Sequence, residues 1–153
     1  MGAWGRALPV LLFLCSGAAA QPSANVNEGR TEPAGERPAI AIELNKLEPG
    51  ANTCHAYFIV SNRTAEPLKD LQLDVYLFDK KGVILRSLRL PFADVGPGRM
   101  KVSPFGLSEL QCGNLGRVLV NDIPVCASPS GAPVKGCADM LAVSTRTDAA
   151  FVY

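Results

Sequence analysis

The sequence predicts a small all-β protein, an antiparallel β-sandwich stapled by disulfides, and three observations lead to that prediction. From Ala39 onward, apolar residues recur at every second position, which is typical of half-buried strands. Turn residues interrupt this alternation at intervals of about ten residues, as expected for seven or eight short strands. Four cysteines lie in the same region. A closed barrel is the competing arrangement.

The N-terminus has the three parts of a cleavable secretory signal peptide, which we assign to residues 1–20. Arg6 supplies the positive charge, and an apolar run follows that is too short to span a bilayer. Ala18-Ala19-Ala20 fits the cleavage site. Because Leu14 before Cys15 is not small and Arg6 is a single arginine, plain Sec export is favoured over a lipoprotein or twin-arginine signal.

The chain after the signal divides into a polar leader and one domain. Residues 21–38 are rich in Pro, Gly, Asn and Glu, a composition that predicts a flexible segment. Residues 39–153 form the expected sandwich domain. The whole chain has 15 basic and 14 acidic residues, so loss of Arg6 leaves no net charge that would indicate nucleic-acid binding. No second apolar run approaches a membrane span, and we expect a soluble mature protein in the periplasm or secreted.

The cysteines predict structural disulfides. Cys15 leaves with the signal, and the even number that remains in an exported domain indicates two bridges. No C-x-x-C pair and only one histidine occur, which disfavours a zinc site or a redox motif. We favour Cys54–Cys112 with Cys126–Cys137, and the other two connectivities stay open.

The first half of the domain is expected to have three strands, one turn and one loop. A strand over 39–44 leads through the turn Glu48–Asn52 into a second strand over 54–60. After the loop 63–67, one wholly apolar face alternates with polar residues along the third strand. That face consists of Leu71, Leu73, Val75 and Leu77.

The second half begins with a hairpin at Asp79–Gly82, where Gly82 is available for a positive φ. Its return strand covers 83–90, and the turn Gly96-Pro97-Gly98 precedes a short strand over 99–105. Residues 107–111 suggest at most one helical turn. The last expected elements are a strand over 116–123, a loop from Cys126 to Cys137, and edge strands within 139–144 and 149–153.

Several of these elements resemble exported immunoglobulin-like modules of the FxLYD type. The resemblance rests on Val60-Ser61-Asn62, Leu73–Asp79, Lys81-Gly82-Val83 and Gly96-Pro97-Gly98, about a third of the chain. Residues 54–137 are also similar to a family of uncharacterised periplasmic proteins of Gram-negative bacteria with four cysteines. The resemblance implies an immunoglobulin-like sandwich and a periplasmic address, and it supplies no catalytic residue.

Candidate chemistry is sparse. His55 is the only histidine, and it lies next to Cys54 in a strand, so an inward Cys54 directs His55 to solvent. Asp70, Asp74 and Asp79 lack the spacing of a calcium loop, and we assign them to turns and a solvated face. Asn62-Arg63-Thr64 matches a glycosylation sequon, which we expect to be idle in a bacterium. We therefore predict no catalytic residue, no metal and no cofactor.

Two places are candidates for binding. Asn121-Asp122 ends an apolar strand, either as a turn or as a binding rim. Phe151 and Tyr153 form an aromatic C-terminal strand that either packs on the sheet or is captured by a partner.

We accordingly expect a non-enzymatic periplasmic interaction module that holds another envelope protein through a sandwich face or an exposed strand edge. Such a module would serve as an accessory subunit or assembly factor. The alternative is a carrier or sensor of a small ligand or metal ion.

Overall fold

The computed structural model describes residues 1–2 and 38–153. The signal peptide and leader expected over residues 1–38 lie almost entirely outside the described residues. Within the described part of the chain, no helix is long and apolar enough to cross a membrane.

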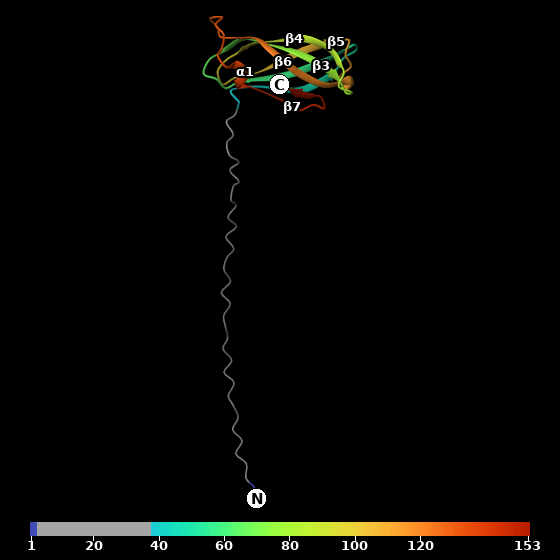
Figure 1. Ribbon diagram of the computed structural model, residues 1–153, viewed down its shortest axis with the longest axis vertical. Coiled ribbons are helices and arrows are strands. Elements are labelled where there is room, and N and C mark those ends of the chain that lie inside the picture. The colour runs from blue at the N-terminus through green and yellow to red at the C-terminus, as the bar shows by residue number, and fades with distance from the viewer. Residues whose placement is uncertain (3–37) are drawn as a thin grey trace. The chain divides into compact units, whose positions relative to one another are not determined.

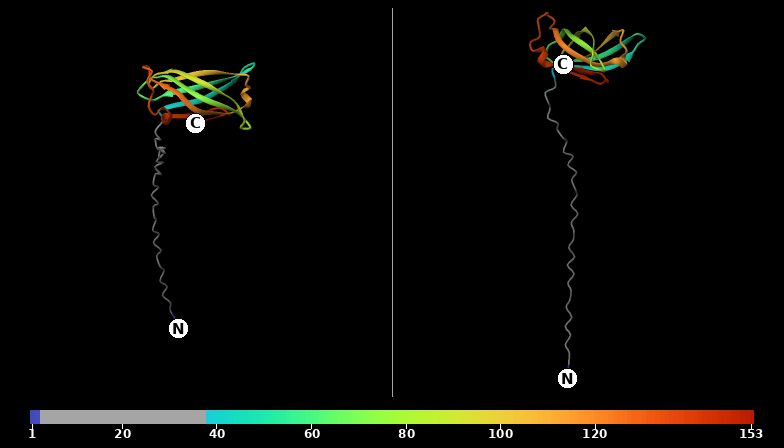
Figure 2. Two further views of the ribbon diagram at one scale, coloured as in Figure 1. Left: turned by 45° about the horizontal axis from the view of Figure 1, so that its top comes forward. Right: turned by 45° about the vertical axis from the view of Figure 1, so that its right-hand side comes forward.

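The domain consists of two four-stranded sheets packed face to face (Figures 1 and 2). One sheet has the order β5-β2-β1-β7 and the other the order β4-β3-β6-β8. The all-β sandwich predicted from the sequence is thus confirmed. The strands are β1 (Ile40–Pro49), β2 (Thr53–Asn62), β3 (Leu68–Asp79), β4 (Ile84–Val95), β5 (Met100–Ser108), β6 (Leu115–Ala127), β7 (Leu141–Thr145) and β8 (Ala150–Val152).

The core lies between the sheets and follows the alternation of the sequence. On β3 the residues of the predicted apolar face are each at most 1% exposed. Phe58 of β2 makes edge-to-face contacts with Phe92 of β4 and Phe151 of β8, at ring-centroid distances of 5.8 and 5.4 Å. Aromatic pairs of this geometry contribute beyond the area they bury. The two sheets are therefore joined by one aromatic cluster as well as by aliphatic packing.

The expectation of purely antiparallel sheets is wrong at two places. β7 pairs parallel with β1, and β8 pairs parallel with β6. Both strands come from the C-terminal tail and form edges of their sheets. The sequence predicted edge strands there, but residue alternation carries no information on strand direction.

Several boundaries also differ from the expectation. β5 extends to Ser108, and the helical turn expected over 107–111 lies instead at η1 (Cys112–Asn114). β6 continues past the predicted end at Ile123 to Ala127. A short helix, α1 (Cys137–Met140), occupies the start of the segment expected to be a strand over 139–144.

Two disulfides join connections to strands. Cys54 at the start of β2 bonds to Cys112 of η1, and Cys126 of β6 bonds to Cys137 of α1. This is the pairing favoured by the sequence. A disulfide-bonded all-β domain fits an exported protein.

Candidate functional site

Strand β4 forms one edge of its sheet and pairs only with β3 among the described residues. It lies beside β5, the edge strand of the opposite sheet, along one margin of the sandwich (Figure 1). An edge strand presents unpaired backbone groups, which proteins usually block with prolines, bulges or covering side chains. How far this edge of β4 is covered therefore decides whether another strand can pair with it.

Side chains from the other sheet cover the second half of β4. The carbonyl oxygen of Val95 accepts a hydrogen bond from Asn62 Nδ2, and that of Ala93 accepts one from Lys101 Nζ, each at 2.9 Å. Neither donor belongs to β3, so these carbonyls point to the outer edge. Backbone groups of alternate residues point to the same edge in an antiparallel ladder. Pro91 fits this pattern because it has no N–H to leave unpaired.

The same alternation directs the N–H and C=O groups of Ser87 and Arg89 to the outer edge of β4. No described side chain or backbone group bonds to them there. Before Arg86, three residues are apolar and exposed, with relative exposures of 59% for Val83, 55% for Ile84 and 41% for Leu85. Leu85 has no partner in the register with β3, which is irregular at this point. We call Ile84–Arg89 the open half of β4 and Leu90–Val95 the closed half.

The other three edges are shorter or interrupted. β7 has 5 residues and β8 has 3. β5 carries Pro104 in its middle, opposite Tyr57, and a proline blocks strand pairing on the side that it faces. In residues 38–153, the open half of β4 is thus the longest stretch of edge without a proline or a capping side chain, and it is regular from Arg86 to Arg89, after the irregularity at Leu85.

A shallow cleft of about 250 Å³ lies between the open half of β4 and the end of β5. Leu88 and Leu107 supply its apolar walls, and Gly106 leaves its rim without a side chain. Its lining is completed by Arg86, Ser87 and Ser108. The margin therefore combines free backbone groups with a place for an apolar side chain.

Positive charge surrounds the β3–β4 hairpin next to this margin. Lys80 and Lys81 are exposed at its tip, and Arg117 lies over the ring of Phe78 at 5.8 Å. Asp79 is occupied within the turn, because its Oδ1 accepts the N–H groups of Lys81 and Val83.

The predicted binding rim Asn121-Asp122 lies in the middle of β6, and the strand end expected there is wrong. The register of β3 with β6 is irregular on both sides of the Asp74–Asp122 pair, which leaves Asn121 as an extra residue. Asp122 Oδ1 bonds to the N–H of Ile123 at 2.8 Å. Both residues are exposed on the outer face of the sheet.

Next to them, Arg89 forms a two-pronged ion pair with Asp74 across the β3–β4 ladder, at 2.7 and 2.8 Å. The hydrogen bond from Arg89 holds the pKa of the Asp74 carboxyl below its ordinary value. In turn, the hydrogen bond to Asp74 raises the pKa of Arg89, and Asp122 adds to that effect. The side chain of Arg89 is therefore engaged, although its backbone is free.

The C-terminal pair is divided between core and surface. Phe151 is 5% exposed and packs on Phe58, whereas Tyr153 is 53% exposed. Phe151 belongs to β8, which pairs with β6 of the same chain, whereas Tyr153 follows the end of β8.

The remaining candidates are isolated. His55 is exposed while Cys54 beside it is buried. Asp70 bonds to Gln72 within its own strand. In residues 38–153, no three His, Cys, Asp or Glu side chains gather as a metal site would require. Asn62 of the sequon is fully buried, and its Nδ2 donates to the carbonyls of Glu66 and Val95.

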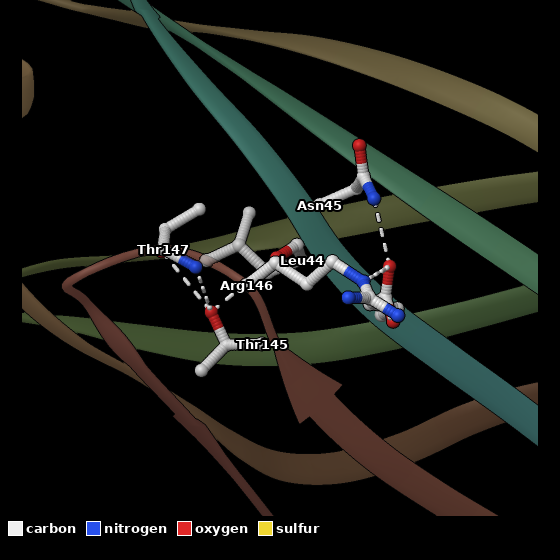
Figure 3. A network of polar contacts seen from close by, with 6 residues as sticks. Leu44, Asn45, Thr145, Arg146 and Thr147 are labelled. Carbon is white, nitrogen blue, oxygen red and sulfur yellow. Dashed lines mark hydrogen bonds and ion pairs between the residues drawn. The ribbon is translucent and has the colours of Figure 1, made fainter.

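A polar network at another end of the domain holds the β7–β8 turn against β1 (Figure 3). Arg146 Nε donates to both carboxylate oxygens of Glu43 at 3.1 Å, and the backbone N–H of Arg146 donates to the carbonyl of Leu44. Thr145 Oγ1 accepts the N–H of Thr147 at 3.0 Å. A cleft of about 410 Å³ beside this turn is lined by Lys46, Lys80, Arg146 and Asp148 among others. Lys46 pairs with Glu48 and Arg146 pairs with Glu43, so neither cation of this cleft is free to bind an anion. Both ion pairs lie next to the register shift of β1 between Leu44 and Lys46.

The sequence did not single out Ser87 and Arg89. Two signals were present in the sequence. One is the apolar run Val83-Ile84-Leu85 next to the hairpin, and the other is Pro91, which has no N–H for pairing. Because a proline in an edge strand faces the outer edge, Pro91 indicates that the backbone groups of Arg89 and Ser87 point the same way.

No family model and no curated protein matches this chain. Among solved structures, it is similar in fold to IrmA from Escherichia coli, with a TM-score of 0.53 and 17% identity. The match covers 68% of this chain and 89% of that chain. The likeness is one of fold to a bacterial protein. The resemblance to FxLYD-type modules finds no support in these comparisons and stays a prediction.

Proposed function

We propose that this protein is a non-enzymatic interaction module of the bacterial periplasm that holds another envelope protein, as an accessory subunit or assembly factor. It would be exported by a Sec-type signal and cleaved near Ala20. The FxLYD-type resemblance of Asn62 and Leu73–Asp79 agrees with such a role, since those modules are exported immunoglobulin-like domains.

One observation carries the proposal, which is the uncovered backbone of Ser87 and Arg89 in the open half of β4. Edge strands left open in this way are templates for pairing with another chain. The exposed Val83, Ile84 and Leu85 extend the same margin with apolar surface. Clustered exposed apolar residues at a polar rim mark interaction sites more often than single ones do.

The experiment is a native pull-down from the periplasm of the host with the tagged mature chain, comparing Ser87→Pro with Ser87→Ala. Proline at position 87 removes an N–H that points to the outer edge. The backbone of Pro91 points to the same edge, and β4 already accommodates that proline. We expect a stoichiometric partner with the native chain and with Ser87→Ala, and its loss with Ser87→Pro.

Thermal melting of both variants serves as the folding control, and we expect melting temperatures close to that of the native chain. The proposal fails if the native chain retains no stoichiometric partner, or if the partner stays bound to a folded Ser87→Pro variant.

A further inference from the structure

We infer that β4 accepts, as an added antiparallel strand, an extended segment of a different protein, whose inward side chains are apolar beside Leu88 and acidic beside Arg86. This inference rests on the proposed function and specifies the partner of the same margin. It follows from three features of the open half, namely its backbone, its cleft and its charge.

The backbone determines the mode of binding. Ser87 and Arg89 both direct an N–H and a C=O to the outer edge, so two residues of an added strand can each exchange a pair of hydrogen bonds with them. Main-chain bonds of this kind supply affinity in strand addition, and pockets for alternate side chains supply specificity. Because the closed half begins at Leu90 and Pro91 follows, the added ladder ends there.

The cleft determines one side chain. Between Arg86 and Phe92, the residues of even number face inward, as the burial of Leu90 and Phe92 shows. The side chain opposite Leu88 therefore enters the cleft between Leu88 and Leu107. An apolar group of moderate size fits these walls, since the cleft measures about 250 Å³ and is open to solvent.

The charge determines the second side chain. Arg86 lines the same cleft, and no ion pair of the described residues involves it. Lys80 and Lys81 add positive charge at the hairpin, where Asp79 is held within the turn and Asp148 lines a cleft together with Lys80. Glu109 follows β5 in the sequence. An acidic side chain opposite Arg86 complements this margin.

Charge also argues against a second copy of this chain as the occupant. In antiparallel pairing of two open halves, the inward residues of one copy face those of the other, so both Arg86 side chains, which have no ion-pair partner among the described residues, would share one face of a short ladder. Like charges on facing strands destabilise the pair.

The probe is a short labelled peptide with the central sequence Val-Thr-Val-Thr-Glu. In antiparallel pairing, its residues lie in order opposite Leu90, Arg89, Leu88, Ser87 and Arg86. The matched controls are the same peptide with Lys for Glu and the same peptide methylated at the threonine nitrogens. Binding to the mature chain is measured by fluorescence anisotropy.

We expect the glutamate peptide to bind at least about tenfold more tightly than the lysine peptide, and the methylated peptide not to bind. Arg86→Glu should reverse the preference between glutamate and lysine, and Ser87→Pro should abolish binding of both. The reversal is informative even if Ser87→Pro fails to fold, because it requires a folded chain.

Equal affinity for the two peptides, or binding that survives methylation, would overturn the inference. A concentration-dependent dimer in sedimentation that Ser87→Pro abolishes would overturn it as well, since the occupant would then be a second copy. If the peptides fail while the native partner still depends on Ser87, the stated side-chain chemistry is wrong and the proposed function stands. If the pull-down finds no native partner, the proposed function itself fails.

Discussion

The two halves of β4 pair with the same strand and differ in what covers their other edge. In the closed half, Asn62 and Lys101 cap two carbonyls and Pro91 lacks the N–H that would remain free. In the open half, the corresponding groups of Ser87 and Arg89 have no such cover. On β4, the capping side chains and the proline are therefore confined to the closed half.

The largest difference in stability should appear when one apolar residue in each half is truncated. Phe92 is 1% exposed and contacts Phe58 and Phe105, whereas Ile84 is 55% exposed. We expect Phe92→Ala to lower the free energy of unfolding by about 4 kcal/mol and Ile84→Ala to change it by less than about 0.5 kcal/mol. Chemical denaturation measures both, and similar losses would show that the open half is packed in solution.

The next effect concerns the cap of the closed half. Asn62→Ala leaves the buried carbonyl of Val95 without its donor and also removes the bonds to Glu66 and Thr64. We expect a loss of about 3 kcal/mol in the free energy of unfolding, because unsatisfied buried groups are costly. Ser87→Ala in the open half is the control and should be neutral. An unchanged free energy of unfolding for Asn62→Ala would contradict the assignment of Asn62 as the cap of the Val95 carbonyl.

A proline scan should separate the two edges of β4 at neighbouring positions. Leu88 directs its N–H to β3, so Leu88→Pro removes a ladder bond and should cost about 2 kcal/mol more than Leu88→Ala. Ser87→Pro removes only an outward N–H and should stay close to the native stability. Equal costs for the two prolines, measured by denaturation, would mean that the alternation along the open half is misassigned.

The smallest effect is the pH dependence of the ion pair on the outer face. Arg89 lowers the pKa of Asp74, so the stabilisation is present above the ordinary carboxyl pKa and is lost as the pH falls through the lowered value. Arg89→Ala should raise the pKa of Asp74 toward its ordinary value in an NMR titration. Arg86→Ala is the control and should leave the titration of Asp74 unchanged. A shift of the Asp74 pKa in Arg86→Ala would show that Arg86 also interacts with Asp74.

The sequence predicted much of the fold because period-two patterning and turn chemistry act locally. The apolar face of β3, the hairpin at Asp79–Gly82 and the disulfide pairing favoured by the sequence all appear in the structure. The parallel pairing of β7 and β8 did not follow from the sequence, because alternation is the same in either direction.

The candidate site was less predictable, since it depends on contacts between strands distant in sequence. Lys101 and Asn62 reach β4 from the opposite sheet, and no local pattern shows which carbonyls they cap. Asn121-Asp122 looked like the end of a strand because two polar residues follow an apolar run. The strand continues because irregular register with β3 accommodates them.

Residue-resolved hydrogen exchange of the mature chain, alone and with its bound partner, tests the central claim most directly. In the free chain, the amides of Ser87 and Arg89 should exchange rapidly while those of Leu88 and Leu90 are protected by β3. With the partner bound, Ser87 and Arg89 should become protected. Protection of these two amides in the free chain, or unchanged rapid exchange in the complex, would contradict the account of β4 as an open edge that binds another protein.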